Sequence, residues 1–224
     1  MTMPATTMRT APVAGIDVGG NRKLCDLVIL QGTSILHRAD GVAPEALLPL
    51  CLEHDVVAVG VDAPSRWWAG EGHRAAERAL VRERISLFST PARERALAST
   101  TGFYDWMFVG ERVYRALAGV YPLLSTARYA GGRVSFETYP HAITCALLGK
   151  DVASARQKRI QRRQLLERMG IDVTMLTSVD ARDAALCALT ARFVVEGGAD
   201  AYGDAEGGYI RVPRVGEPID CAAP

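Results

Sequence analysis

The sequence lacks the short motifs that identify several enzyme classes. It has no G-x-x-x-x-G-K-[ST] phosphate loop, no G-x-S-x-G nucleophile elbow and no H-E-x-x-H metal motif. Its four histidines are isolated, and its five cysteines form no C-x-x-C pair. These absences argue against P-loop chemistry, against serine-hydrolase chemistry of that type and against a structural zinc site. An odd number of scattered cysteines also argues against a disulfide framework.

Long apolar runs and a large excess of one charge are also missing. No stretch reaches the roughly 18 apolar residues needed to span a bilayer, and the first residues do not form a secretory signal. We therefore expect a cytoplasmic protein without a membrane partner. Lys and Arg number 26 against 25 Asp and Glu, so the net charge of +1 argues against a strongly basic coat for nucleic acid.

What is present indicates one globular domain. With 224 residues, 49% of them hydrophobic, the chain suits a single domain over residues 12–224, preceded by a flexible tail over residues 1–11. Apolar patterning predicts three antiparallel strands in the first forty residues, followed by strands and helices in alternation. This order is typical of an α/β domain with a mixed sheet. The expected strands after the first three cover 56–62, 133–138 and 209–212, and the expected helices cover 44–53, 72–86, 103–118, 155–169 and 180–196.

Acidic residues fall at places where a ligand would bind. Five acids from four distant segments lie in or at the ends of predicted strands, or at the start of an apolar helix. Ligands of open α/β sheets gather beyond the carboxyl ends of the strands, so we expect these acids to converge there. The five are Asp17, Asp62, Glu137, Asp180 and Asp183.

Clustered carboxylates repel one another and need a cation or a proton. Mg²⁺ or Mn²⁺ with oxygen ligands would satisfy them, and two such ions would support hydrolysis of a phosphodiester bond. We expect Asp17, Asp62, Asp180 and Asp183 to bind metal, and Glu137 to orient a water or to support the site from outside the ligand set.

Each acid also has a simpler interpretation. Asp180 and Asp183 would suit the first turn of a helix, with Asp180 as its N-cap. Glu137 would suit a solvated strand face, and Asp62 the start of a turn. Asp17 is harder to explain in this way, because it interrupts an apolar strand. Asp26 interrupts the next strand but has no obvious partner, so it ranks lower.

Four segments of the chain resemble a known family. They read Gly-Ile-Asp-Val-Gly-Gly around Asp17, Val-Gly-Val-Asp-Ala-Pro around Asp62, Phe-Glu-Thr-Tyr-Pro around Glu137, and Asp-Ala-Arg-Asp-Ala from Asp180. They are similar, in order and over about residues 13–213, to the domain of unknown function 429 family of predicted nucleases. The resemblance implies an RNase H-like fold, in which three antiparallel strands precede parallel ones. It also implies that Asp17, Asp62, Asp180 and Asp183 are the acids that bind metal, and that Glu137 belongs to the family's own motif.

A basic segment offers a site for phosphates. Residues 150–168 contain seven Lys or Arg and two acids, and Arg156, Arg159 and Arg163 fall on one helical face. That face is either a solvated surface or a contact for the phosphates of a nucleic acid or nucleotide. Trp67-Trp68 and the aromatic residues of 103–106 are either core residues or surfaces for stacking bases.

Two rival functions remain open. Residues 15–23 also resemble the first phosphate-binding turn of actin-like sugar kinases, although 224 residues are few for the two domains of such kinases. The domain would otherwise serve as a non-catalytic nucleic-acid-binding module. The sequence leaves the oligomeric state open, as well as the choice among DNA, RNA and a small nucleotide.

Overall fold

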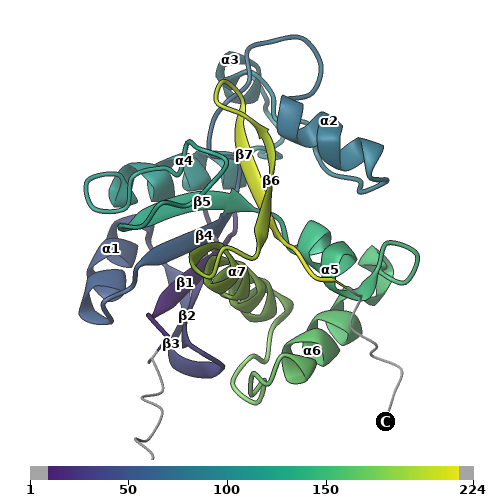
Figure 1. Cartoon of the computed structure of the whole chain (residues 1–224). Coiled ribbons are helices and arrows are strands. Elements are labelled where there is room, and N and C mark those ends of the chain that lie inside the picture. The colour runs from purple at the N-terminus through teal and green to yellow at the C-terminus, as the bar shows by residue number, and fades with distance from the viewer. Residues whose placement is uncertain (1–9, 217–224) are drawn as a thin grey trace, which may run out of the picture.

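The structure, a computed structural model, describes residues 10–216. Its centre is a seven-stranded sheet in the order β3-β2-β1-β4-β5-β7-β6 (Figure 1). Helices cover both faces of this sheet. The strands are β1 (Val13–Val18), β2 (Cys25–Gln31), β3 (Ser34–Val42), β4 (Ala58–Asp62), β5 (Val134–Thr138), β6 (Ala199–Asp204) and β7 (Gly208–Pro213).

The strand directions confirm the predicted mixed sheet. The first three strands pair antiparallel, and β1, β4, β5 and β7 then run parallel. The sequence analysis missed β6, which pairs antiparallel with β7 as the last strand of the sheet. Every residue of β6 is only half-buried, so it lacks the continuous apolar run that marked the inner strands.

The helices form two layers around the sheet. Helices α1 and α4 lie on one face, and α7 lies on the other with α5 and α6 beside it (Figure 1). The short helix α3 was not predicted. The helices are α1 (Pro44–Glu53), α2 (Ala75–Arg82), α3 (Arg93–Leu97), α4 (Asp105–Leu117), α5 (Pro140–Leu148), the 3₁₀ turn η1 (Ala155–Gln157), α6 (Lys158–Arg168) and α7 (Val179–Val195).

Helix α7 lies unusually close to the sheet because two strand residues have no side chain. Gly15 of β1 and Gly60 of β4 are paired in register. A Cβ at Gly15 would lie 2.0 Å from the carbonyl oxygen of Ala184, and one at Gly60 would lie 2.6 Å from that of Cys187. Any larger residue at either position would push the helix away. The two glycines therefore set the height of α7 above the carboxyl ends of β1 and β4.

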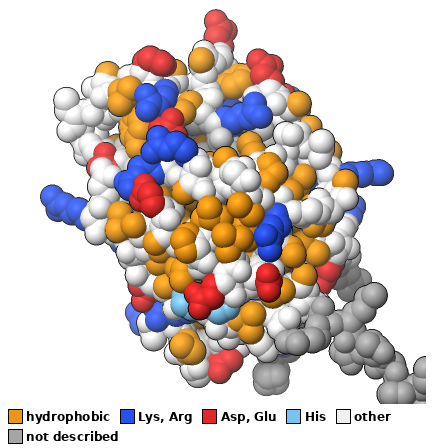
Figure 2. Space-filling view, turned by 90° about the vertical axis from the view of Figure 1, so that its left-hand side faces the viewer, with side chains coloured by type: hydrophobic (Ala, Val, Ile, Leu, Met, Phe, Trp, Pro, Cys, Tyr) orange, Lys and Arg blue, Asp and Glu red, His pale blue; other side chains and the backbone are white. Residues whose placement is uncertain are grey.

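The surface matches the balanced composition. From the side of α1 and α4 (Figure 2), acidic and basic side chains are interspersed around hydrophobic atoms, and neither charge forms a continuous coat. No helix within residues 10–216 has both the length and the apolarity needed to cross a membrane. The predicted tail, residues 1–11, lies almost wholly outside the described residues, as does the end of the predicted domain at 217–224.

Candidate active site

Asp17 and Asp62 lie next to one another at the ends of two parallel strands. They are paired in register on β1 and β4, two residues beyond Gly15 and Gly60. Because side chains alternate along a strand, both acids project toward the face that α7 covers. The charge of Asp62 raises the pKa of Asp17, as expected for neighbouring carboxyl groups. The expected convergence of these two strand acids is therefore seen.

The first turn of α7 brings two more acids to the same place. Asp183 is 6% exposed, and its charge acts on both strand acids. Asp180 lies one turn earlier and is more exposed. The interpretation of Asp180 as the N-cap was wrong, because the N-cap is Ser178, whose hydroxyl accepts a hydrogen bond from the Ala181 amide. Since Ser178 caps the helix, Asp180 and Asp183 are not needed for that purpose.

The environment of the acids disfavours their ionised forms. Burial, followed by the repulsion of Asp62 and Asp183, raises the pKa of Asp17 well above its ordinary value. Burial and the charge of Asp183 raise the pKa of Asp62 to about 8. Burial also raises the pKa of Asp183 to about 7, although the nearby Arg162 opposes the shift. At neutral pH the cluster is therefore only partly ionised.

Two cations from distant segments neutralise part of the cluster. Arg162 of α6 is 6% exposed and forms an ion pair with the Oδ2 atom of Asp183. Lys23, in the turn between β1 and β2, forms an ion pair with Asp180. The sequence analysis assigned neither residue to the site. A signal existed for Arg162, because it shares a helix face with Leu165 and Leu166, where an unpaired arginine would be costly.

The donor atoms suit a hard divalent cation. All are carboxylate oxygens, and the Oδ1 atom of Asp183 is buried without a hydrogen-bond partner. A buried acceptor of this kind is costly unless a ligand satisfies it. Within residues 10–216, however, no three acidic, histidine or cysteine side chains form a ready-made metal site. The donor atoms of the acids are thus of the type that binds such an ion, while Asp183 is ion-paired with Arg162.

Glu137 lies outside this cluster. It is paired in register with Val61, so it projects toward the opposite face of the sheet from Asp62. The solvated interpretation was also wrong, because Glu137 is only 4% exposed. Arg74 donates to its two oxygens at 2.9 and 2.6 Å, and Ser65 donates through its amide at 2.8 Å and its hydroxyl at 3.0 Å.

Arg74 connects Glu137 to a second buried acid. Its Nε atom donates to Glu77 at 2.8 Å, and Thr90 donates to the same carboxylate through its amide and hydroxyl. Arg74 and Glu77 are fully buried. The network therefore ties β5 and α2 to the loops at residues 65 and 90, beside the carboxyl end of β4. Glu137 therefore holds Arg74 and the loop at residue 65 beside the end of β4.

Asp26, which the sequence ranked below the other acids as a candidate site residue, lies next to the cluster. It pairs in register with Asp17 on the antiparallel strand β2 and is 7% exposed. Burial raises its pKa, and a hydrogen bond from the Gly41 amide opposes the shift. The signal was present in the sequence, since Asp26 interrupts an apolar strand in the same way as Asp17.

Exposed aromatic rings lie at the same end of the sheet. Phe88 lines a small pocket together with Asp62, and its ring meets that of Phe103 at 5.5 Å between centroids. Both side chains are at least half exposed, at 63% and 50%. Asp105, two residues beyond Phe103, accepts a hydrogen bond from Asn21 in the turn after β1. Phe88 therefore lies in a pocket with Asp62 and Glu137, and the hydrogen bond from Asn21 to Asp105 connects the turn after β1 to the start of α4.

The predicted basic face is exposed but not uniform. Arg156 lies in η1, whereas Arg159 and Arg163 lie on α6 and border a shallow pocket with Arg182. Arg163 forms an ion pair with Glu167, one helical turn away. Arg162, on the buried side of the same helix, reaches the acid cluster. Helix α6 therefore carries basic side chains both to the surface and to the candidate site.

The comparisons place the chain in a family. Residues 15–207 match the family described as "Protein of unknown function (DUF429)", and the chain belongs to it. No curated protein matches the sequence. Among solved structures, RuvC of Thermus thermophilus is 17% identical, with a TM-score of 0.47 over 84% of this chain and 98% of that one. A likeness of that extent carries no argument about activity.

Proposed function

We propose that the protein is a metal-dependent nuclease that hydrolyses phosphodiester bonds. The observation that carries this proposal is the meeting of half-buried Asp17 and Asp62 with buried Asp183. All three pKa values are raised, and the Oδ1 atom of Asp183 has no hydrogen-bond partner. Folded proteins keep such groups chiefly where they function. Oxygen-only donors at the ends of parallel strands suit Mg²⁺ or Mn²⁺ and a phosphate substrate.

In this proposal each acid has a separate task. Asp17 and Asp62, which are paired in register, would bind the cation, and Asp183 would complete the set from α7. Asp180 would become a further metal ligand once its ion pair with Lys23 is broken. A bound divalent cation supplies Lewis-acid activation of a water and neutralises the charge that develops on the leaving oxygen. Glu137 would act only through Arg74, by fixing the loops beside the site.

The surroundings support a nucleic acid as substrate. Phe88, which shares a pocket with Asp62, and the neighbouring Phe103 present exposed rings, and base stacking on such rings contributes about 1–3 kcal/mol per base. Arg156, Arg159 and Arg163 would contact phosphates through the exposed face of α6 and the turn before it. Arg162 would be free to contact the substrate when a metal ion takes its place at Asp183.

The test is cleavage of labelled DNA and RNA by purified protein with Mn²⁺ or Mg²⁺. We expect cleavage by the wild type and only background cleavage by Asp17→Asn. The matched control is Asp151→Asn, whose side chain is 90% exposed and distant in sequence from the cluster; it should cleave like the wild type. Cleavage by Asp17→Asn at the wild-type rate would contradict the proposal.

Two other outcomes would select the rival functions. Oligonucleotide binding without cleavage, unchanged in Asp17→Asn, would favour a binding module. ATP turnover that needs a small hydroxyl-bearing acceptor would favour the kinase. The turn from Gly19 to Leu24, which that interpretation requires to hold phosphates, is closed by a hydrogen bond from the Gly19 amide to the Leu24 carbonyl oxygen at 2.7 Å.

A further inference from the structure

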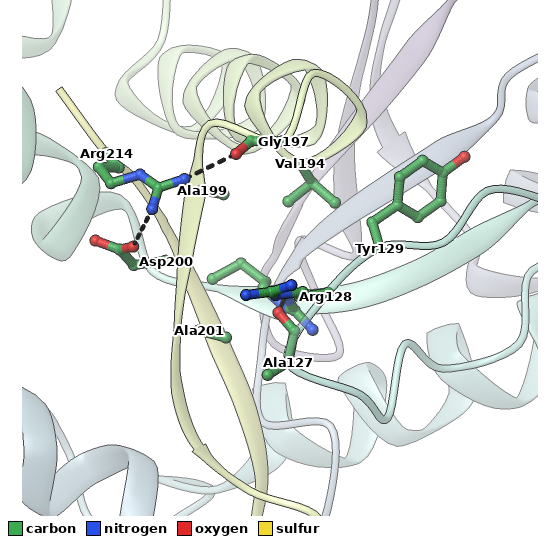
Figure 3. A pocket seen from close by; sticks show the side chains of 10 residues that line it. Ala127, Arg128, Tyr129, Val194, Gly197, Ala199, Asp200, Ala201 and Arg214 are labelled. Atoms are coloured by element: carbon green, nitrogen blue, oxygen red, sulfur yellow. Dashed lines mark hydrogen bonds and ion pairs between the residues drawn. The ribbon is translucent and has the colours of Figure 1, made fainter.

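A second cavity lies at the other end of α7. It has a volume of about 450 Å³ and lies between the end of this helix, strand β6 and the loop that contains residues 127–129 (Figure 3). Eleven residues separate Asp183 from Val194 in its wall, which corresponds to about 16 Å along the helix axis. The cavity therefore does not share the acid cluster, and none of the functions considered above uses it.

The wall of this cavity has an excess of positive charge. Arg128, Arg211 and Arg214 line it, against one acid, Asp200. Arg214 lies 3.5 Å from Asp200 and donates to the Gly197 carbonyl oxygen at 2.8 Å, as Figure 3 shows. Arg128 is exposed and forms no ion pair with any residue of 10–216. Two of the three guanidinium groups therefore have no carboxylate of the described chain beside them.

Arg211 is the more informative of these two. Its side chain extends from β7 and the residue is only 2% exposed. Its Nη1 atom donates to the Ala127 carbonyl oxygen at 2.7 Å and its Nη2 atom donates to that of Thr126, while its Nε atom is buried without a partner. Within residues 10–216 it forms no ion pair. Burial lowers its pKa, and Tyr209, whose ring centroid lies 5.6 Å from the guanidinium carbon, opposes that shift.

A buried cation without a counter-ion is costly, so folded proteins pair such groups or use them to bind anions. Two carbonyl oxygens and the Tyr209 ring contact Arg211, and none of these groups carries a formal negative charge. Planar guanidinium groups bind phosphate through paired hydrogen bonds. Arg128 and Arg211, which have no ion-pair partner within residues 10–216, thus share one cavity wall with Arg214 and offer positive charge to an anionic group.

We propose that this cavity binds a small phosphate-bearing molecule, with the phosphate held by Arg128, Arg211 and Arg214. Its volume falls in the range of about 300–1,000 Å³ typical of small-molecule sites. The remaining wall is apolar or aromatic and includes Val194, Ala199 and Tyr129. It suits the organic part of a ligand about the size of a mononucleotide.

Calorimetric titration of the full chain tests this site. Adenosine 5′-monophosphate should bind once per chain, adenosine should not bind, and inorganic phosphate should bind more weakly and compete. Arg128→Gln and Arg214→Gln should each weaken the binding of the monophosphate at least tenfold, because each removes a charged hydrogen bond. Both side chains are exposed, so these variants should fold.

The control is Arg115→Gln, an exposed arginine of α4 on the other face of the sheet, which should bind like the wild type. Asp17→Asn should also bind like the wild type, which separates this proposal from that of the acid cluster. Equal binding by Arg128→Gln, Arg214→Gln and the control would overturn the proposal. The proposal would also be overturned if the two variants weakened the binding of an oligonucleotide but left the binding of the monophosphate unchanged. The occupant of the cavity would then be a nucleic-acid backbone.

Discussion

Asp17 costs the fold stability. It lies half-buried near Asp62 and Asp183, and its pKa is raised by desolvation and by their charges. In the unfolded chain the same group ionises freely near its ordinary pKa of about 3.9. Above that pH the acid must keep its proton or repel its neighbours in the folded state. The cluster therefore lowers the stability of the metal-free fold and favours the binding of a cation.

We accordingly predict that Asp17→Asn is more stable than the wild type in metal-free buffer at pH 8. A gain on the order of 2 kcal/mol in the free energy of unfolding would raise the melting temperature by about 4–8 °C in a chain of this size. Thermal unfolding monitored by circular dichroism, with a chelator present, measures this gain. Asp151→Asn is the control and should unfold like the wild type, since its carboxylate is exposed. A destabilised Asp17→Asn variant would show that the carboxylate supports the fold.

Glu137 should respond in the opposite sense. Its carboxylate accepts four hydrogen bonds from Arg74 and Ser65, and an amide would turn a donor toward donors. Breaking a buried ion pair from one side costs about 3–5 kcal/mol, so Glu137→Gln should lower the melting temperature clearly. Its calorimetric affinity for Mn²⁺ at a temperature where it is folded should equal that of the wild type. Unchanged stability together with lost cleavage would instead make Glu137 a catalytic residue.

Among the elements, α7 depends most on the sheet beneath it. The Cβ of Gly15→Ala would lie 2.0 Å from the Ala184 carbonyl oxygen and 2.1 Å from the Ala188 nitrogen, and neither backbone atom moves without the helix. We predict a loss of about 3 kcal/mol or more, at the upper end for overpacked cores. Gly119→Ala is the control, because its Cβ would meet no atom within 4 Å. Chemical unfolding of both variants gives the comparison, and equal stabilities would mean that α7 is not held at this height.

The inner elements were predictable from sequence, and the outer ones were not. β1 and β4 are buried on both faces and therefore read as apolar runs, each interrupted by an acid at its carboxyl end. β6 and α3 have no such pattern, since β6 is half-buried throughout and α3 has five residues. Short or partly exposed elements owe their conformation to tertiary contacts, which a local pattern does not report.

The same limit applies to the candidate site. The acids were predictable because a charged residue at the end of an apolar strand conflicts with its surroundings. Their pairing with Arg162 and Lys23 was not, because these residues reach Asp183 and Asp180 from segments 21 and 157 residues away. The apolar helix face of Arg162 indicates that it needs a partner but not which one. The side chain of Glu137 points away from Asp62 because Glu137 is paired with Val61. Only the assembled sheet defines this register.

At the scale of the whole molecule, the near-zero net charge conceals local groups of opposite sign at the two ends of α7. Acids gather at its first turn, and uncompensated arginines line the cavity beyond its last turn. The acid end gives the protein a pH dependence of stability. Between about pH 4 and the raised pKa values of Asp183, about 7, and Asp62, about 8, the folded chain binds more protons through these groups than the unfolded chain. This contribution to stability is therefore present at low pH and is lost as pH rises through 7 and 8.

A divalent cation should reverse that trend. Binding at the acids requires their ionised forms and releases protons, so affinity should increase with pH. We predict that saturating Mn²⁺ raises the melting temperature more at pH 8 than at pH 6. The comparison of wild type with Asp17→Asn removes the contributions of all other titrating groups, His141 among them, whose pKa burial lowers. The variant should show little metal-induced stabilisation at either pH, and its stability should fall less between pH 6 and pH 8. An equal response of both proteins to Mn²⁺ would place the ion elsewhere, because only a cation held by Asp17 makes the stabilisation depend on that carboxylate.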